Sequence, residues 1–105
     1  MAKWQPMTAE EVESRIDEEL VECTPEQRTI FAKYRVPLRA TPIERYGNHE
    51  SVFVAAQRGD EVMYYEDVEE GWNFSPLTFD GHIAQHSCNQ DELKYALWRW
   101  VQQGG

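Results

Sequence analysis

Cysteine, basic residues and long hydrophobic runs are all scarce in this sequence. Its two cysteines, Cys23 and Cys88, are far apart and form no CxxC pair, so we expect no disulfide framework and a reducing compartment. No stretch approaches the roughly 18 apolar residues that a membrane-spanning helix needs. Residues 1–7 contain one lysine and no apolar segment, which is not typical of a secretory signal. These absences predict a cytoplasmic protein that does not bind membranes.

Signatures of catalysis and of cofactor binding are missing as well. The chain contains no glycine-rich phosphate loop, no G-x-S-x-G sequence and no cysteine-protease context. Ser87 stands between His86 and Cys88, but adjacent residues of a strand point to opposite faces, so His86 is badly placed to act as its base. We therefore expect no cofactor and no catalytic residues, and we favour a binding protein over an enzyme.

The length and the composition are those of one folded domain. A chain of 105 residues and 12.3 kDa buries roughly two-thirds of its unfolded surface, which is enough for a core without disulfides or metal. Hydrophobic residues make up 41% and aromatic residues 12% of the chain, too many for a disordered protein. We expect a single domain over residues 1–105.

Acidic residues outnumber basic ones by 19 to 10, which gives a formal net charge of −9. Such a surface repels phosphate backbones, so we expect no binding to nucleic acid. The charge is unevenly distributed, because residues 47–92 contain ten acids and a single base, Arg58, whereas residues 24–46 contain five bases and two acids. This distribution favours a basic protein as the partner.

Two capping boxes near the start of the chain predict a pair of helices. In the first, the side chains of Thr8 and Glu11 each accept a hydrogen bond from a backbone N–H group at the helix start that has no other partner. In the second, Thr24 precedes Gln27, and Pro25 suits the first helical position. The short link between them predicts a helical hairpin. The predicted helices span residues 8–22 and 25–35.

Alternating apolar residues, turn residues and prolines predict the strands that follow. Gly59-Asp60 separates two such runs and has its glycine first, as a type II′ hairpin turn requires. Asp80-Gly81 predicts another hairpin turn, and Gly47-Asn48 a turn before the first run. Two prolines limit residues 37–45 to an edge strand or an extended loop. The remaining predicted strands span residues 51–57, 62–66, 72–75 and 82–88.

The end of the chain predicts one further helix. Asn89 is a suitable N-cap, with Glu92 as its capping-box partner. Apolar side chains on one face would pack on the sheet: Leu93, Ala96, Leu97, Trp100 and Val101. The sequence therefore predicts an α+β fold with an N-terminal helical hairpin, a three- to four-stranded antiparallel sheet and a C-terminal helix packed on the sheet.

The acidic and aromatic segment 61–72 is the candidate partner-binding surface. Carboxylates steer a basic partner during encounter, and tyrosine and tryptophan are preferred interface anchors. The predicted partner-binding residues are Glu61, Tyr64, Tyr65, Glu66, Asp67, Glu69, Glu70 and Trp72. The alternative interpretation is a solvated hairpin end, kept charged against edge-to-edge pairing. In size, acidity and order of elements the chain is similar to small bacterial immunity and accessory proteins, which implies a non-catalytic domain that binds one partner.

A second candidate site contains His82, His86 and Cys88, which would share one face of a strand. Imidazole and thiolate are zinc ligands, yet positions 82 and 86 of a strand lie roughly 13 Å apart at about 3.3 Å per residue. We therefore assign no metal site. The alternative function is small-molecule binding, metal binding or catalysis on this His82/His86 face.

Two aromatic residues of the last predicted helix, Tyr95 and Trp98, fall outside its apolar face. They are either covered by Trp4 from the N-terminal segment or exposed as an aromatic patch for self-association. The sequence leaves the oligomeric state open.

Overall fold

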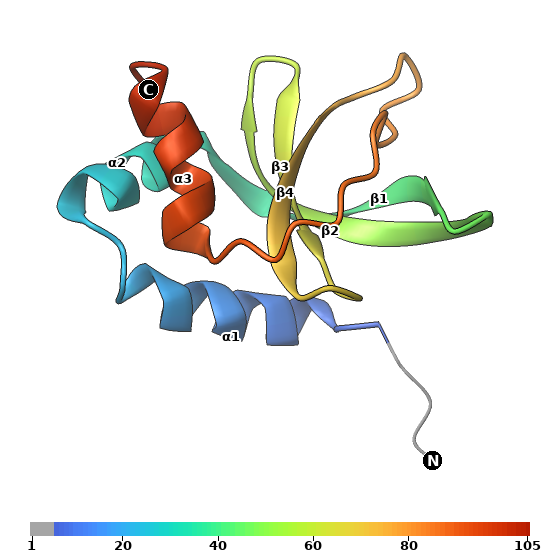
Figure 1. Ribbon diagram of the computed structural model, residues 1–105, viewed down its shortest axis with the longest axis horizontal. Helices are drawn as coiled ribbons and strands as arrows, with labels where there is room; N and C mark the ends of the chain where they lie inside the picture. Colours follow the sequence, from blue (N-terminus) through green and yellow to red (C-terminus); the bar gives the residue numbers. More distant parts are fainter. Residues whose placement is uncertain (1–5) are drawn as a thin grey trace.

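The computed structural model describes residues 6–105 and has the predicted α+β architecture (Figure 1). Three helices lie to one side of a four-stranded antiparallel sheet whose strands follow one another in chain order, β1-β2-β3-β4. The elements are α1 (Ala9–Leu20), α2 (Pro25–Tyr34), β1 (Arg35–Arg45), β2 (Asn48–Arg58), β3 (Glu61–Glu66), β4 (Gly71–Pro76) and α3 (Leu93–Gln102).

Both predicted capping boxes are formed, and they set where α1 and α2 begin. Thr8 and Glu11 exchange side-chain and backbone hydrogen bonds at 3.0 and 3.2 Å, and Thr24 with Gln27 does the same at 2.9 and 3.1 Å. The segment 37–45 belongs to β1, which is an edge strand as its prolines require. The pairing of β1 with β2 is irregular between Arg35 and Arg39, around Pro37.

The two tight hairpins obey turn stereochemistry. Gly59 has φ of +62° at the predicted turn between β2 and β3, a conformation that glycine adopts without strain. The turn before β2 is shifted by one residue from the prediction. It consists of Tyr46-Gly47, both with positive φ as a type I′ turn requires, and this pairs Arg45 with Asn48.

Apolar side chains pack on both faces of the sheet. Between the helices and the sheet the large buried side chains include Phe31, Met63, Tyr65, Trp72 and Trp100. On the opposite face, segment 77–92 covers a smaller cluster made of Ile43, Val52, Val54, Val62, Tyr64 and Ile83. The C-terminal helix packs on the sheet as predicted, with Leu93, Ala96, Leu97 and Trp100 buried. The irregular segment 77–92 therefore covers the face of the sheet opposite the helices.

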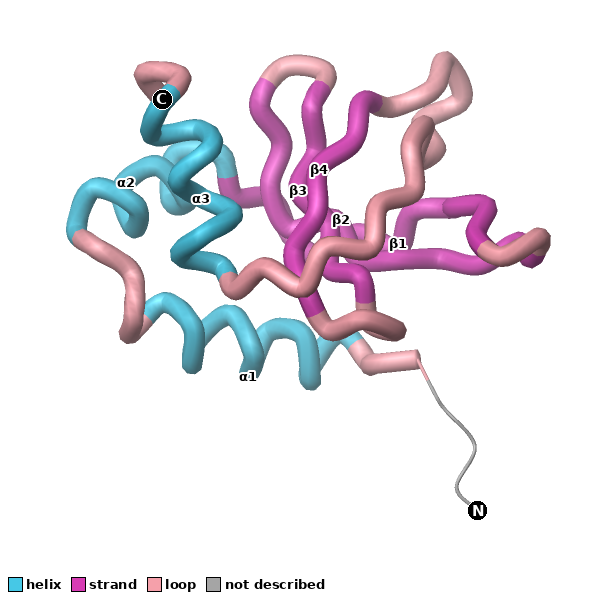
Figure 2. The backbone as a smooth tube through the Cα atoms, in the orientation of Figure 1, coloured by secondary structure: helices cyan, strands magenta, loops and turns pink. Residues whose placement is uncertain are grey.

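The prediction of a strand at residues 82–88 is wrong, because this segment is a loop with one isolated bridge from Ile83 to Leu77 (Figure 2). Side chains of the sheet take the place of a paired strand. The Ser75 hydroxyl accepts hydrogen bonds from the N–H groups of Ala84 and Gln85 at 3.0 and 2.9 Å. The Tyr64 hydroxyl accepts one from the N–H of Ser87 at 2.9 Å.

The predicted cap of the last helix is also wrong. Residue Asn89 donates its N–H to the Asn73 side chain, and its carbonyl lies so close to Gly71 that a Cβ there would meet it at 2.2 Å. The helix begins three residues later, after Glu92, whose side chain makes no capping bond. The capping group comes from α1 instead, since Glu19 accepts the N–H of Leu93 at 2.7 Å.

We expect Glu19→Ala to lower the free energy of unfolding by about 1–3 kcal/mol. The substitution removes both the cap of α3 and the acceptor for the Trp72 indole N–H, which lies 3.3 Å from the carboxylate. Urea unfolding followed by circular dichroism measures the change. Glu18→Ala, on the exposed side of α1, is the matched control, and an equal loss in both variants would contradict the capping role.

Candidate functional site

Four charged side chains meet where the ends of three strands converge. Arg45 ends β1, Glu50 lies on β2, and Glu66 and Asp67 follow one another at the end of β3. The Arg45 side chain is 1% exposed and uses Nη1 for Glu66 Oε1 at 2.5 Å, Nη2 for Asp67 Oδ1 at 3.0 Å, and Nε for Glu50. These four residues are referred to below as the Arg45 cluster.

The electrostatics of the Arg45 cluster leave it rich in negative charge. Burial opposes the charge of Arg45, but hydrogen bonds with Glu50 and Glu66 outweigh it and raise the pKa of the guanidinium further above its usual range. One guanidinium therefore faces three carboxyl groups. Glu66 is fully buried and is satisfied in addition by the Val68 N–H at 3.0 Å and by His86 Nε2 at 2.9 Å.

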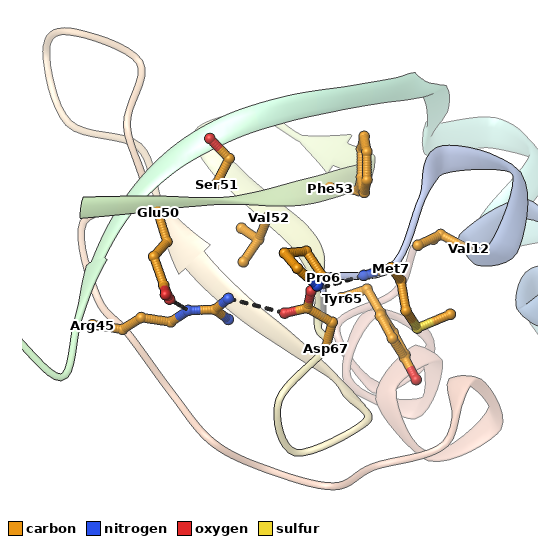
Figure 3. Close-up of a pocket in the computed structure, with 10 residues that line it drawn as sticks. All are labelled: Pro6, Met7, Val12, Arg45, Glu50, Ser51, Val52, Phe53, Tyr65 and Asp67. Carbon is orange, nitrogen blue, oxygen red and sulfur yellow. Dashed lines mark hydrogen bonds and ion pairs between the residues drawn. The ribbon is translucent and has the colours of Figure 1, made fainter. Parts of the chain in front are cut away.

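An apolar pocket opens beside the Arg45 cluster (Figure 3), with a volume of about 300 Å³. Its apolar wall comes from α1 and its N-terminal approach and from the two central strands: Met7, Val12, Val52, Phe53 and Tyr65. Ligand pockets in proteins combine such apolar walls with a few convergent polar groups. We refer to it as the Arg45 pocket.

Two carboxylates, Glu50 and Asp67, form the polar wall of the Arg45 pocket together with the Arg45 guanidinium. Asp67 uses both oxygens, one for Arg45 and the other for the N–H of Met7 at 3.2 Å, which attaches the approach to α1 to the end of β3 (Figure 3). Glu50 binds Arg45 through Oε1 and its side chain is 31% exposed. Within residues 6–105, Glu50 Oε2 has no hydrogen-bond partner.

The predicted aromatic anchors lie inside the protein. Tyr64, Tyr65 and Trp72 are all at most 1% exposed, and each uses its polar atom internally. The Tyr65 hydroxyl accepts a hydrogen bond from Arg15 at 3.1 Å, and burial raises the pKa of Tyr65 to about 12. The Tyr64 hydroxyl accepts a hydrogen bond from the N–H of Ser87 in segment 77–92, and the Trp72 indole N–H donates one to Glu19. These rings are part of the core and leave no aromatic surface in segment 61–72.

The predicted carboxylates are divided among three places. Glu66 and Asp67 belong to the Arg45 cluster, while Glu61 accepts hydrogen bonds from Arg99 at 2.5 Å and from the Trp100 indole at 2.7 Å. The remaining two, Glu69 and Glu70, lie in the turn between β3 and β4, half-buried and exposed respectively. The eight predicted residues therefore do not share one surface.

Sequence reasoning missed Arg45 and Glu50 as members of a site. A signal for Arg45 was present, because it follows Thr41 and Ile43 at two-residue spacing and so shares their buried face of β1. An arginine on the buried face of a strand needs carboxylates as partners, because an unpaired buried charge is costly. Which carboxylates these are depends on strand order and register.

His82 and His86 line one pocket of about 430 Å³ that also contains Glu50. Because segment 77–92 is a loop, both imidazoles line this pocket and are not held at the spacing of an extended strand. His86 Nε2 lies 3.4 Å from the Cys88 sulfur, and the Cys88 sulfur lies 3.4 Å from the Tyr46 hydroxyl. The hydrogen bond between the Tyr46 hydroxyl and the Cys88 sulfur contributes most to raising the pKa of Tyr46 to about 12. In the part of the chain that the structure describes, no group of histidine, cysteine and acidic residues is arranged to hold a metal ion.

The aromatic pair of α3 is half exposed, with Tyr95 at 57% and Trp98 at 47%. Trp4, the predicted cover, lies outside the described residues. None of the helices found between residues 6 and 105 has the length and apolar character to cross a membrane.

Comparison with known proteins does not identify a relative. No protein-family model, no curated protein and no solved structure matches the chain. Its function has to be argued from the site and from the distribution of surface charge.

We expect Glu61→Gln to lower the free energy of unfolding by about 1–2 kcal/mol at pH 7. Burial favours the neutral acid, but hydrogen bonds from Arg99 and Trp100 outweigh it and lower the pKa of Glu61 below 4.5 in the folded protein. This stabilisation is present above pH 4.5 and is lost as the pH falls through the folded value, so the two proteins should converge in acid. Urea unfolding from pH 7 to pH 3 measures the difference.

The matched control for Glu61→Gln is Asp60→Asn, an exposed neighbour in the β2–β3 turn. The control should track the wild-type protein across the whole pH range. A loss in Glu61→Gln that stays constant from pH 7 to pH 3 would show that the carboxylate charge is not its source.

Proposed function

We propose that this chain is a non-catalytic interaction domain that binds a basic protein surface, and that the contact is made by the exposed acidic side of α1. The observation that carries the proposal is a set of exposed carboxylates on this helix and the turn after it that form no ion pair with any residue of segment 6–105. We call it the α1 acidic face: Glu10, Glu11, Asp17, Glu18 and Glu22.

The α1 acidic face is not neutralised from within the molecule. Among residues 6–105 none of its carboxylates forms an ion pair, and the one base of α1, Arg15, is engaged by Tyr65 and by Glu70 at 3.7 Å. The residues that α1 buries, Val12 and Ile16, point to the core. The opposite side of the helix is therefore a strip of negative charge.

The surface around α1 is continuous with other features that suit a partner. A shallow depression of about 410 Å³ includes Glu10, Glu11 and Glu18, and it shares Met7 with the Arg45 pocket. The ion pair of Arg15 with Glu70 brings the β3–β4 turn beside the helix, so Glu69 and Glu70 remain in the proposed surface. A strip of one charge raises the association rate with an oppositely charged partner.

The proposal agrees with the similarity to immunity and accessory proteins, which act by occupying one partner. A cationic toxin or a nucleic-acid-binding protein has the surface chemistry that the α1 acidic face would recognise. Neutralising Glu66 and Asp67 is not a test of docking, because it breaks the buried Arg45 cluster.

We expect the triple variant Glu10→Gln, Asp17→Asn and Glu18→Gln to slow association with the basic partner roughly tenfold at low salt. The partner is obtained by affinity capture on the purified protein, and the rate is measured by stopped-flow or surface plasmon resonance. For the wild-type protein the rate should fall steeply between low salt and about 0.5 M, because salt screens exposed charges.

The control for this variant has the same net charge but changes acids elsewhere on the surface, as Glu44→Gln, Asp60→Asn and Asp80→Asn. It should associate at nearly the wild-type rate. If both triple variants associate equally fast, the α1 acidic face is not the docking surface.

A second candidate function is small-molecule binding in the pocket that contains His82 and His86. The observation that favours it is that both imidazoles line one concave site together with His49 and Glu50. A thermal-shift screen of small molecules tests it. A compound that stabilises the wild-type protein but not His82→Gln supports this function, and no stabilising compound counts against it.

A further inference from the structure

We propose that the Arg45 pocket receives a lysine side chain of the basic partner. This inference rests on the proposed function and names the chemistry of the contact. The pocket would hold the four-carbon stem against its apolar wall and the ammonium group against Glu50 and Asp67.

Charge selects a cation. The polar wall has two carboxylates and one guanidinium, and a third carboxylate, Glu66, lies directly behind Arg45. Each of the three Arg45 nitrogens already faces a carboxylate, so an anionic ligand would have to displace one of them, and Glu66 or Asp67 would then be left buried and unpaired. A cation meets the opposite situation, because Glu50 Oε2 is still an available acceptor among the described residues.

The apolar wall selects a flexible hydrocarbon stem. Met7, Val52 and Phe53 line the pocket next to the carboxylates, and lysine is the side chain that combines a long aliphatic stem with a compact cation. The rings of Phe53 and Tyr65 add surfaces over which an ammonium group is attracted.

The size and position of the pocket favour a side chain over a free cofactor. A volume of about 300 Å³ is at the lower end of ligand pockets. Its lining includes Pro6 and Ser51, which are exposed, so the pocket is reached from the surface. Through Met7 it adjoins the depression on α1, so a partner lying on the α1 acidic face is beside the pocket.

The test uses the full chain and three probes followed by ¹H–¹⁵N NMR titration. Nα-acetyl-lysine N-methylamide presents the lysine side chain, Nα-acetyl-norleucine N-methylamide presents the same stem without the ammonium group, and hexylammonium presents a free amine. The lysine probe should bind at least about tenfold tighter than the norleucine probe and shift the amide signals of Val52 and Phe53.

Two variants locate the binding. Glu50→Gln keeps an oxygen for Arg45 but removes the charge, and it should weaken the lysine probe roughly tenfold or more. Ser51→Phe adds bulk to an exposed lining residue without touching the carboxylates, and it should block the probe even if Glu50→Gln perturbs folding. Glu44→Gln, an exposed acid that does not line the Arg45 pocket, is the matched control and should bind as the wild type does.

The proposal is overturned if lysine and norleucine probes bind equally, or if Ser51→Phe leaves the lysine affinity unchanged. Binding of hexylammonium without binding of the lysine probe also overturns it, since the pocket then takes a free amine. If the wild-type protein does not bind the lysine probe, but the triple variant of the α1 acidic face still associates slowly with the partner, this inference fails and the proposed function stands. If the lysine probe binds but both triple variants associate with the partner equally fast, the result supports the lysine site and contradicts docking on the α1 acidic face.

Discussion

The fold converges on one guanidinium shared by three carboxylates. Arg45 joins the end of β1 to Glu50 of β2 and to Glu66 and Asp67 at the end of β3. Through Asp67 the cluster reaches the N–H of Met7 before α1, and through Glu66 it reaches His86 in segment 77–92. The cluster thus connects the sheet, the approach to the first helix and the covering loop through side chains of which Arg45, Glu66 and Asp67 are buried.

A buried cluster of this kind stabilises only if every member is satisfied, because removing ions from water is expensive. Glu66 meets that condition with partners on both oxygens. Glu50 is the member that remains partly in solvent, and the apolar pocket opens beside it. The carboxylates that bind Arg45 also supply the negative charge of the proposed lysine site, so one arrangement links the stability of the fold to its proposed recognition chemistry.

Side chains from distant segments bind the backbone at two places, in segment 77–92 and at the start of α3, and at both places the sequence prediction is wrong. Ser75, Tyr64 and Asn73 bind the backbone of segment 77–92, so residues 82–88 need no strand partner. Glu19 caps α3 from a helix 74 residues earlier in the chain, so the local signal at Asn89 was not used. The aromatic residues Tyr64 and Tyr65 are buried for a related reason: β3 lies between the helices and segment 77–92, so both of its faces are covered.

Local chemistry was sufficient for the two capping boxes, the β2–β3 hairpin, the edge position of β1 and the α+β class, because each depends on residues close together in the chain. The sequence also determined the acidity on which the proposed function depends. Tertiary structure decided which acids are exposed, since Glu66 is buried against Arg45 and His86 whereas Glu70, four residues later in the β3–β4 turn, is exposed. Burial and ion pairing are set by contacts between distant segments, and no local pattern encodes them.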